Sequence, residues 1–414
     1  MDLETANKVT GRKGIPSEWS IKHLGDLASF KTGPFGSALH KSDYVLDGTP
    51  LINPMHIVNG GIVPSREMTV NRKTARRLSD YSLQEGDVII GRRGEMGRCA
   101  VVGNREEGWL CGTGSLIIRP NDYSVAGFLQ RILASTEMVK AIENASVGST
   151  MVNLNQGILE SLEVRTPPLP EQRAIAEVLS DVDALIEQLD ALIAKKRAVK
   201  TATMQRLITG KQRLPVFDGA WESRRLGDLL TEPATYGIVK AGDFGRTGIP
   251  MIRGGDIKEG SIGKNLPLVS PEKSNEYSRT ILSEGDIVIA LVGYPGESAV
   301  VPRHLEGANV SRAVGVLRLG SSMDGEFLVQ FLNSPSGRST FLKPGVGSAQ
   351  TVVNLRDINN LRLSVPCLRE QKAIATILSD MDAEIEALEA RREKTQRLKQ
   401  GMMQELLTGR TRLV

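Results

Sequence analysis

EQRAIAEVLSDVDALIEQLDALIAKK, residues 171–196, decides the organisation of this 414-residue chain, because the chain contains it twice. A close copy, EQKAIATILSDMDAEIEALEARREK, occupies residues 370–394. At a constant offset of 199 residues, segments 171–214 and 370–413 agree at 23 of 44 positions. A repeat of this kind indicates a duplicated architecture.

The repeat continues upstream of both copies. EGDVIIGRRGEMGRCAVV at 85–102 aligns with EGDIVIALVGYPGESAVV at 284–301. WSIKHLGDL from Trp19 resembles WESRRLGDL from Trp221, although the spacing there differs slightly. The sequence therefore predicts a module, a helix, a second module and a second helix, with boundaries at 1–165, 166–212, 213–363 and 364–414.

Proline and glycine mark the ends of both predicted helices. TPPLP and VPCL precede the two helices and interrupt any strand before them. Gly210 and Gly409 stand where a glycine commonly ends a helix. Residues 171–209 contain neither Pro nor Gly, so this helix is expected to be about 58 Å long at 1.5 Å per residue.

Both helices carry a heptad pattern of apolar residues. The pattern comprises Ile175, Leu179, Val182, Ile186, Leu189 and Ile193 in the first copy, and Ile374, Leu378, Met381, Ile385 and Leu388 in the second. It is interrupted at Lys196 and Arg392. Such a seam indicates pairing with another helix, and the other copy is the obvious partner. We favour antiparallel over parallel pairing, because a parallel pair would crowd the modules at one end; packing of each helix on its own module is the alternative.

The modules read as α+β with a predominantly β core. Short apolar runs such as GDVIIGRRG and SLIIRP in the first module, and GDIVIALVGYPG and VGVLRLG in the second, are bounded by turn residues and predict strands. One helix is expected in each module, near 124–144 and 325–334. The loops diverge between the copies, which indicates two binding sites of one kind with different targets.

Composition narrows the class of protein. The formal net charge is +4, which permits nucleic-acid binding without requiring it. No apolar run is long enough to cross a bilayer and the first residues contain no apolar signal region, so we expect a cytoplasmic protein. The three cysteines form no CxxC pair, and the four histidines are scattered. With neither a GxxxxGK[ST] loop nor an HExxH pair, the sequence predicts no metal site and no catalytic residue.

PLPEQRAIAEVLSDVDALIEQ and its copy, the GD-[VI]-[VI] strand, the GPFGS loop at 33–37 and the two-module plan resemble the specificity subunit of type I restriction–modification systems. The resemblance covers essentially the whole chain. It implies two target recognition domains, at 1–165 and 213–363, each contacting one half of a split double-stranded DNA sequence. The helices would form an antiparallel coiled coil that sets the spacer.

The resemblance also implies the partners. Two methylation subunits would flank the spacer and carry S-adenosylmethionine and the adenine chemistry. Restriction subunits that use ATP would join some complexes. This chain would be non-catalytic and would hold no cofactor.

Candidate DNA-contacting residues are basic or polar side chains in the divergent loops, because phosphates are bound by Lys and Arg, and base edges by polar side chains. They are Lys31, Ser37, His40, Lys41, Arg92, Arg93 and Arg98 in the first module, and Tyr236, Lys240, Arg246, Arg253 and Arg312 in the second. Solvation or a salt bridge explains any single one better than base contact does, but we expect several members of the set to contact DNA. The basic run from Lys195 to Lys200 is either a solvated helix face or a contact for phosphates or a methylation subunit.

Two further hypotheses remain open at this point. The chain could be a stand-alone bivalent DNA-binding or decoy protein, which a stable methylase partner would exclude. It could also be a tandem scaffold that binds proteins, against which salt-dependent DNA affinity would argue.

Overall fold

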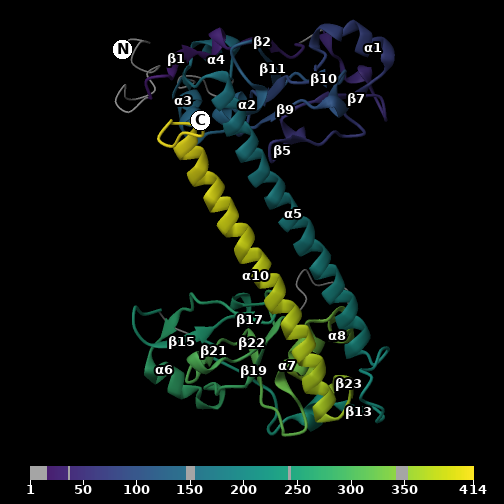
Figure 1. The fold of residues 1–414 in the computed structure, drawn as a ribbon. Coiled ribbons are helices and arrows are strands. Elements are labelled where there is room, and N and C mark those ends of the chain that lie inside the picture. The colour runs from purple at the N-terminus through teal and green to yellow at the C-terminus, as the bar shows by residue number, and fades with distance from the viewer. Residues whose placement is uncertain (1–15, 36–37, 146–153, 241–243, 342–352) are drawn as a thin grey trace. The chain divides into compact units, whose positions relative to one another are not determined.

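The computed structural model describes residues 16–35, 38–145, 154–240, 244–341 and 353–414. The chain forms two compact units, which we call unit 1 (Met1–Gln188 with Arg391–Val414) and unit 2 (Leu189–Ala390). Each long helix contributes one part to each unit, and the colour in Figure 1 follows the residue number along both helices.

Unit 1 is built around a four-stranded antiparallel sheet. Its strand order is β2 (Ala28–Thr32), β11 (Ser115–Pro120), β8 (Val88–Gly91) and β9 (Cys99–Val101). A second sheet has the order β10 (Leu110–Cys111), β4 (Thr49–Ile52), β7 (Thr69–Val70) and β3 (Tyr44–Val45), with β10 parallel to β4. The remaining pairs are β1 (Ser20–His23) with β12 (Glu163–Thr166), and β5 (Ile57–Val58) with β6 (Gly61–Ile62); short helices are α1 (Arg72–Arg77) and α4 (Gln156–Ser161).

Unit 2 repeats this plan. Its main sheet has the order β14 (Thr235–Tyr236), β22 (Val314–Leu317), β19 (Ile287–Ala290) and β20 (Ser298–Val300). The second sheet is β18 (Leu268–Val269), β15 (Ile249–Ile252) and β21 (Asn309–Val310). The pairs are β13 (Glu222–Arg225) with β23 (Arg362–Val365), and β16 (Ile257–Lys258) with β17 (Ser261–Ile262); short helices are α6 (Pro271–Glu276) and α9 (Leu355–Asn360). The α+β class with mainly β modules is confirmed.

The central strand of each main sheet is buried on both faces. In unit 1, Val88 and Ile90 pack in one core with Phe128, whereas Ile89 packs in another with Ile117. Because successive strand residues point to opposite faces, the sheet lies between two apolar layers. The near-continuous apolar run GDVII follows from this double burial.

The corresponding strand of unit 2 shows the same division. Ile287 and Ile289 join Phe327 in one core, and Val288 joins Val316 in the other. The two units therefore share a framework as well as a sequence pattern.

In unit 1, two helices occupy the stretch 124–144 where one was expected; in unit 2, one helix matches the expected stretch 325–334 and a second follows it directly. Unit 1 has α2 (Ala126–Leu133) and α3 (Thr136–Ala145), and unit 2 has α7 (Gly325–Asn333) and α8 (Pro335–Phe341). A serine starts the second helix in both cases. The Ser135 hydroxyl accepts a hydrogen bond from Met138 N at 3.2 Å, and the Ser334 hydroxyl accepts one from Gly337 N at 2.9 Å. Capping by a serine side chain competes with continuation of the first helix.

The long helices are α5 (Leu169–Ile208) and α10 (Leu368–Leu406). Gly210 and Gly409, with φ of 68° and 75°, adopt the left-handed conformation just beyond their ends, as predicted. Among the described residues, no helix is long and apolar enough to cross a membrane.

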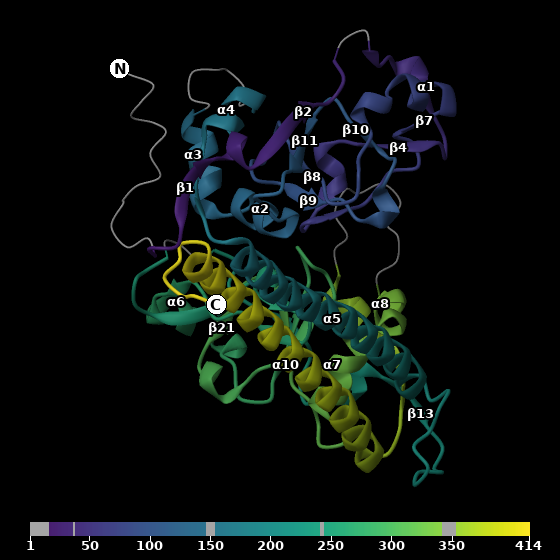
Figure 2. The same ribbon diagram turned by 45° about the horizontal axis from the view of Figure 1, so that its top comes forward.

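The long helices pair antiparallel within each unit. In unit 2, Lys196 Nζ lies 2.6 Å from the Glu384 carboxylate and Lys200 Nζ lies 2.5 Å from that of Asp382, so a step forward on α5 is a step backward on α10. In unit 1, Lys399 Nζ lies 2.5 Å from the Asp183 carboxylate. Figures 1 and 2 both show the two helices side by side.

The heptad residues are buried or half-buried throughout. Ile175, Leu179, Leu189, Ile193, Ile374, Leu378 and Ile385 are buried, and Val182, Ile186, Met381 and Leu388 are half-buried. Ile175 and Leu179 share one core with the module helix α2 and with Leu406 and Leu407 of α10. The beginning of each helix thus packs on its own module and also on the end of the other helix, so the pairing interpretation is confirmed and packing on the own module alone is excluded.

Candidate nucleic-acid interface

In unit 1, four loops meet at one end of the main sheet. Gly33, after β2, abuts the chain before β11 so closely that a Cβ atom would lie 2.0 Å from the Gly112 carbonyl oxygen. The Asn53 side-chain oxygen, after β4, accepts a hydrogen bond from Gly114 N at 3.3 Å. Arg92 N, after β8, donates to Gly114 O at 2.8 Å. Gly33 is therefore required by contact between protein segments, and not only by a turn.

The same four loops meet in unit 2. A Cβ atom on Gly237, after β14, would lie 1.9 Å from the Val310 carbonyl oxygen. One on Gly254, after β15, would lie 2.3 Å from the Val292 carbonyl oxygen in the loop after β19. Backbone packing thus holds these loops together and leaves their side chains free to differ.

The structure brings several predicted residues of unit 1 to this sheet end. Arg93 is exposed and Arg98 is half-exposed in the β8–β9 loop, where Arg98 pairs with Glu95 at 2.5 Å. Lys31 is exposed on β2, 3.8 Å from Asp80. These cations are available to phosphates or bases, with the salt bridges as competitors.

Arg92 occupies a different environment. Only 5% of its surface is exposed, its Nε donates to Leu154 O at 2.8 Å, and its guanidinium lies 4.9 Å from the centre of the Phe35 ring. Burial, followed by the neighbouring Arg93 charge, lowers the pKa of Arg92. Its contacts position the loop.

The other candidates of unit 1 lie elsewhere. His40 and Lys41 are exposed just before β3, at the edge of the second sheet. Ser37 lies outside the described residues.

In unit 2, Tyr236, Lys240 and Arg312 are all exposed. They lie near one another because a hydrogen bond of 2.9 Å from Arg312 N to Ile238 O joins the two loops that carry them. Arg246 is exposed in the segment before β15, next to the second sheet.

Arg253 is exposed but bound within its own loop. Its guanidinium makes two hydrogen bonds of 2.9 Å to the Asp256 carboxylate, and this interaction raises the pKa of Arg253.

Sequence reasoning missed the large apolar side chains exposed in these loops. They are Phe35 and Met55 in unit 1, and Val239, Phe244 and Tyr294 in unit 2. A pattern of residue types does not reveal exposure, and the candidates were chosen among basic and polar side chains, so these apolar residues were left out. Only Tyr294 carried a usable signal, because GYPG is a tight-turn sequence that presents its side chains to solvent.

The Glu-Gln pair at the start of each repeat also has a structural role. The buried Glu171 carboxylate accepts a hydrogen bond from Trp19 Nε1 at 2.9 Å and pairs with Arg412 at 2.6 Å. Glu370 pairs with Arg213 at 2.7 Å and accepts a hydrogen bond from Trp221 Nε1 at 3.3 Å. The start of one long helix is thus tied to the segment that follows the other. The repeated tryptophans and the shared ending T-G-x-x-R-L are the features of the sequence that could have predicted these contacts.

The neighbouring glutamine joins the helix to its module. The Gln172 side-chain oxygen accepts a hydrogen bond from Val125 N at 3.0 Å, and its Nε2 donates to Tyr123 O and Pro167 O at 3.1 and 3.0 Å. Gln371 makes the corresponding bonds in unit 2, at 2.8 to 3.0 Å. The four loops at the end of each main sheet therefore belong to a module that is joined firmly to a long helix.

The basic run on α5 is largely paired. Arg197 lies 2.6 Å from Glu389, and Lys196 and Lys200 contact carboxylates of α10 as described above. Charge pairs thus replace apolar contacts where the heptad pattern is interrupted in the first copy. Within the described part of the chain, no group of three or more His, Cys, Asp or Glu residues is placed to hold a metal ion.

Comparison with known proteins agrees with this geometry. A family described as the type I restriction modification DNA specificity domain matches residues 16–195 and again 219–397. The chain is 24% identical to the putative type I restriction enzyme MjaX specificity subunit of Methanocaldococcus jannaschii, over 96% of this chain and 95% of the relative. It is 25% identical to the type I restriction enzyme EcoBI specificity subunit of Escherichia coli, over 92% and 83%.

The fold has solved counterparts. The type I restriction-modification system S subunit from M. genitalium matches with a TM-score of 0.59 and 16% identity, over 97% of this chain and 98% of that one.

Proposed function

Because the chain belongs to the type I restriction–modification DNA specificity family and contains the family's domain twice, we propose that it selects the DNA sequence on which a restriction–modification complex acts. One observation carries the proposal. Each unit presents the same four backbone loops at one end of the same sheet, while the exposed side chains on those loops differ. This arrangement suits two readers of two different half-sites.

We propose that DNA binding combines phosphate and base contacts from these loops. Exposed cations such as Lys31 and Arg93 in unit 1, and Lys240 and Arg312 in unit 2, suit phosphate or base contacts. The role of this chain is recognition, and the chemistry belongs to partner subunits. S-adenosylmethionine and, where restriction subunits join, ATP would be bound by those partners.

The long helices support a second role, the docking of two copies of one methylation subunit. Buried positions that are identical in both repeats are explained by packing inside this chain. Packing inside this chain does not explain exposed positions that are identical in both repeats, because many residue types are equally compatible with contact with solvent. Three such positions follow one another at helical spacing on each helix: Asp181, Ala184 and Glu187 on α5, and Asp380, Ala383 and Glu386 on α10. We call them the repeated surface positions.

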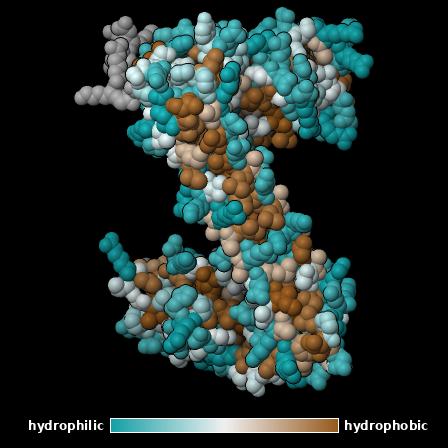
Figure 3. Space-filling model, viewed as in Figure 1, coloured by the Kyte–Doolittle hydropathy of each residue, from teal (hydrophilic) through white to brown (hydrophobic). Residues whose placement is uncertain are grey.

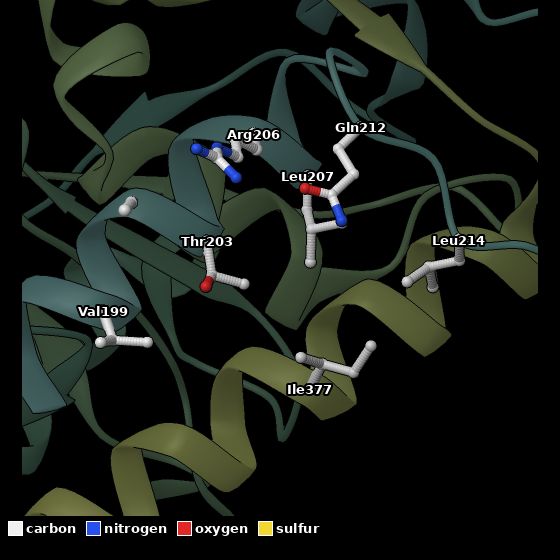
Figure 4. A pocket seen from close by; sticks show the side chains of 8 residues that line it. Val199, Thr203, Arg206, Leu207, Gln212, Leu214 and Ile377 are labelled. Atoms are coloured by element: carbon white, nitrogen blue, oxygen red, sulfur yellow. The ribbon is translucent and has the colours of Figure 1, made fainter.

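Apolar surface on the helices fits the same role. Figure 3 shows apolar side chains gathered over the long helices, where Leu192, Val199 and Leu398 are exposed. In unit 2 a pocket of about 460 Å³ is lined by residues of α5, of α10 and of the segment after α5 (Figure 4). Val199, Leu207 and Ile377 give it apolar walls, and Arg206 adds a positive charge. A partner helix that covers such surface gains burial energy.

Copurification with co-expressed methylation subunits tests the docking proposal. Asp181→Arg with Asp380→Arg is expected to reduce the number of bound methylation subunits, because a bulky charge replaces a repeated contact. Thr201→Arg with Gln400→Arg is the matched control, since both positions are exposed but differ between the repeats. Equal binding by both double variants would contradict the proposal.

DNA binding by the assembled complex tests the recognition proposal. Affinity for a genomic site is expected to fall steeply with salt, as phosphate contacts release counterions. DNA binding that does not depend on salt would favour the protein-scaffold hypothesis. A chain that recruits no methylation subunit would favour the stand-alone hypothesis.

A further inference from the structure

The β8–β9 loop of unit 1 and the β19–β20 loop of unit 2 share one backbone. Both contain seven residues, 92–98 and 291–297, at the offset of the repeat. Gly94 and Gly293 have φ of 81° and 93°, and Gly97 and Gly296 have φ of 75° and 91°. These positive values require glycine or a strained residue, so the turn is fixed in the same shape twice.

Further hydrogen bonds anchor both loops at their bases. Gly91 N donates to Arg98 O at 2.9 Å in unit 1, and Ala290 N donates to Glu297 O at 2.7 Å in unit 2. Leu154 N and Val353 N donate to the first residue of the respective loop, both at 3.0 Å. A side chain at a given loop position is therefore presented from an equivalent place in each unit.

The side chains at the loop tips have opposite character. In unit 1, exposed Arg93 stands two residues before Glu95, whose side chain is 73% exposed and pairs with Arg98. In unit 2, the matching positions hold Val292 and Tyr294, and Tyr294 is 63% exposed between a glycine and a proline. An exposed aromatic ring on a turn fixed by two glycines suits contact with a partner.

Each tip fits a different base pair. A guanidinium donates to guanine O6 and N7, and a carboxylate accepts from the cytosine N4 amino group, so Arg93 and Glu95 together complement a G·C pair. An apolar face contacts the thymine methyl group, which distinguishes T·A from the other pairs in the major groove. The exposed ring of Tyr294 offers such a face, whereas half-buried Val292 packs against the apolar core of unit 2.

We propose that the two loop tips occupy matching places in the two half-sites, with the β8–β9 tip (Arg93, Glu95) selecting a G·C pair and the β19–β20 tip (Tyr294) selecting a T·A pair. The inference rests on the proposed function, because it assigns the chemistry of readout within the same recognition loops. The difference between the half-sites at this place then follows from the exposed side chains of the two tips.

Methylation of a DNA library with randomised half-sites, by the complete complex, measures the preference at every position. Tyr294→Ala is expected to reduce the preference for T·A at one position by about tenfold, because one specific base contact is lost. Tyr294→Phe retains the ring and is expected to retain the preference. Tyr123→Ala, which removes an exposed tyrosine outside these loops, should leave both half-sites unchanged.

Transplanting the tips gives the stronger test. Val292→Arg with Tyr294→Glu is expected to change the preferred pair of the unit 2 half-site from T·A to G·C at that position alone. The unit 1 half-site is the internal control, because its unchanged preference shows that the variant complex is folded and assembled.

The outcomes separate the two proposals. If the wild-type complex prefers no bipartite sequence, the proposed function fails. If it prefers one, but neither Tyr294→Ala nor the transplant alters any position, only the assignment of the loop tips is overturned.

Discussion

At the scale of the residue, Gln172 shows what the repeated Glu-Gln pair does. Its buried amide satisfies one backbone N–H and two carbonyl groups, and truncation would leave all three without that partner. Gln172→Ala is expected to lower the free energy of unfolding by about 2 kcal/mol, measured by chemical denaturation. Gln371→Ala should cost a similar amount, whereas Gln205→Ala, at an exposed site on the same helix as Gln172, should change little. Equal effects of all three variants would contradict the assigned role.

His56 and Asp256 occupy matching places after β4 and β15. The His56 Nδ1 accepts a hydrogen bond from Asn53 N at 3.1 Å, and the Asp256 carboxylate accepts one from Arg253 N at 2.8 Å. Burial lowers the pKa of His56, against a smaller opposing effect of the Leu51 carbonyl. As the pH is lowered past the ordinary histidine pKa of about 6.5, the unfolded state therefore binds a proton before the folded state does. The free energy of unfolding decreases as the pH is lowered further, until the folded-state pKa is reached.

This linkage gives a prediction for unit 1. The unfolding midpoint should be nearly constant between about pH 7 and 8 and decrease as the pH falls through the histidine range. Asn53→Arg with His56→Asp copies the pair of unit 2 and should reduce that decrease, as thermal unfolding at several pH values would show. An unchanged slope in the double variant would exclude His56 as its source.

The sequence located individual residues unevenly. The heptad residues were identified because burial follows a fixed period along a helix. The candidate arginines were selected by type alone, so buried Arg92 and exposed Arg93 looked the same although adjacent side chains on a loop can face opposite ways. Exposed Phe35 and Phe244 were missed because exposure depends on how the loop is folded.

At the scale of the element, the direction of helix pairing required the structure. A heptad seam is compatible with parallel and antiparallel partners, so the apolar spacing did not decide between them. The pairs Lys200–Asp382 and Lys399–Asp183 lie at matching repeat positions and fix the antiparallel arrangement within each unit. The strands were found from apolar runs bounded by turns, whereas the break between α2 and α3 was not, because it depends on a serine cap within an otherwise helical pattern.

A charge-reversal series tests this pairing. Lys200→Glu and Asp382→Lys are each expected to lower stability, and the combined variant should recover part of the loss. The coupling energy of the double-mutant cycle should be about 0.5–1 kcal/mol, since both side chains are partly exposed and solvent screens the interaction. Strictly additive effects in a low-salt denaturation experiment would contradict a direct contact.

At the scale of the whole molecule, the repeat explains why one chain carries two readers. The duplicated parts preserve the helix contacts and the loop backbone, and the exposed loop side chains are free to change. If the paired helices set the spacing of the half-sites, seven residues inserted at matching positions in both should keep the seam in register and add about 10.5 Å.

The expected outcome is a methylated site with unchanged half-sites and about three more unread base pairs, at 3.4 Å per pair. Lengthening one helix alone should instead reduce the yield of folded chain, because the apolar seams no longer match. An unchanged gap after the double insertion would exclude the helices as the spacer.

The most direct test of the central claim is modification-sensitive sequencing of genomic DNA from cells that contain the chain with its methylation partners, and from cells that lack this chain alone. We expect methylated adenines in one bipartite motif, with two defined halves and a fixed gap, to be present in the first and absent from the second. Identical methylation of every bipartite motif in both would contradict it.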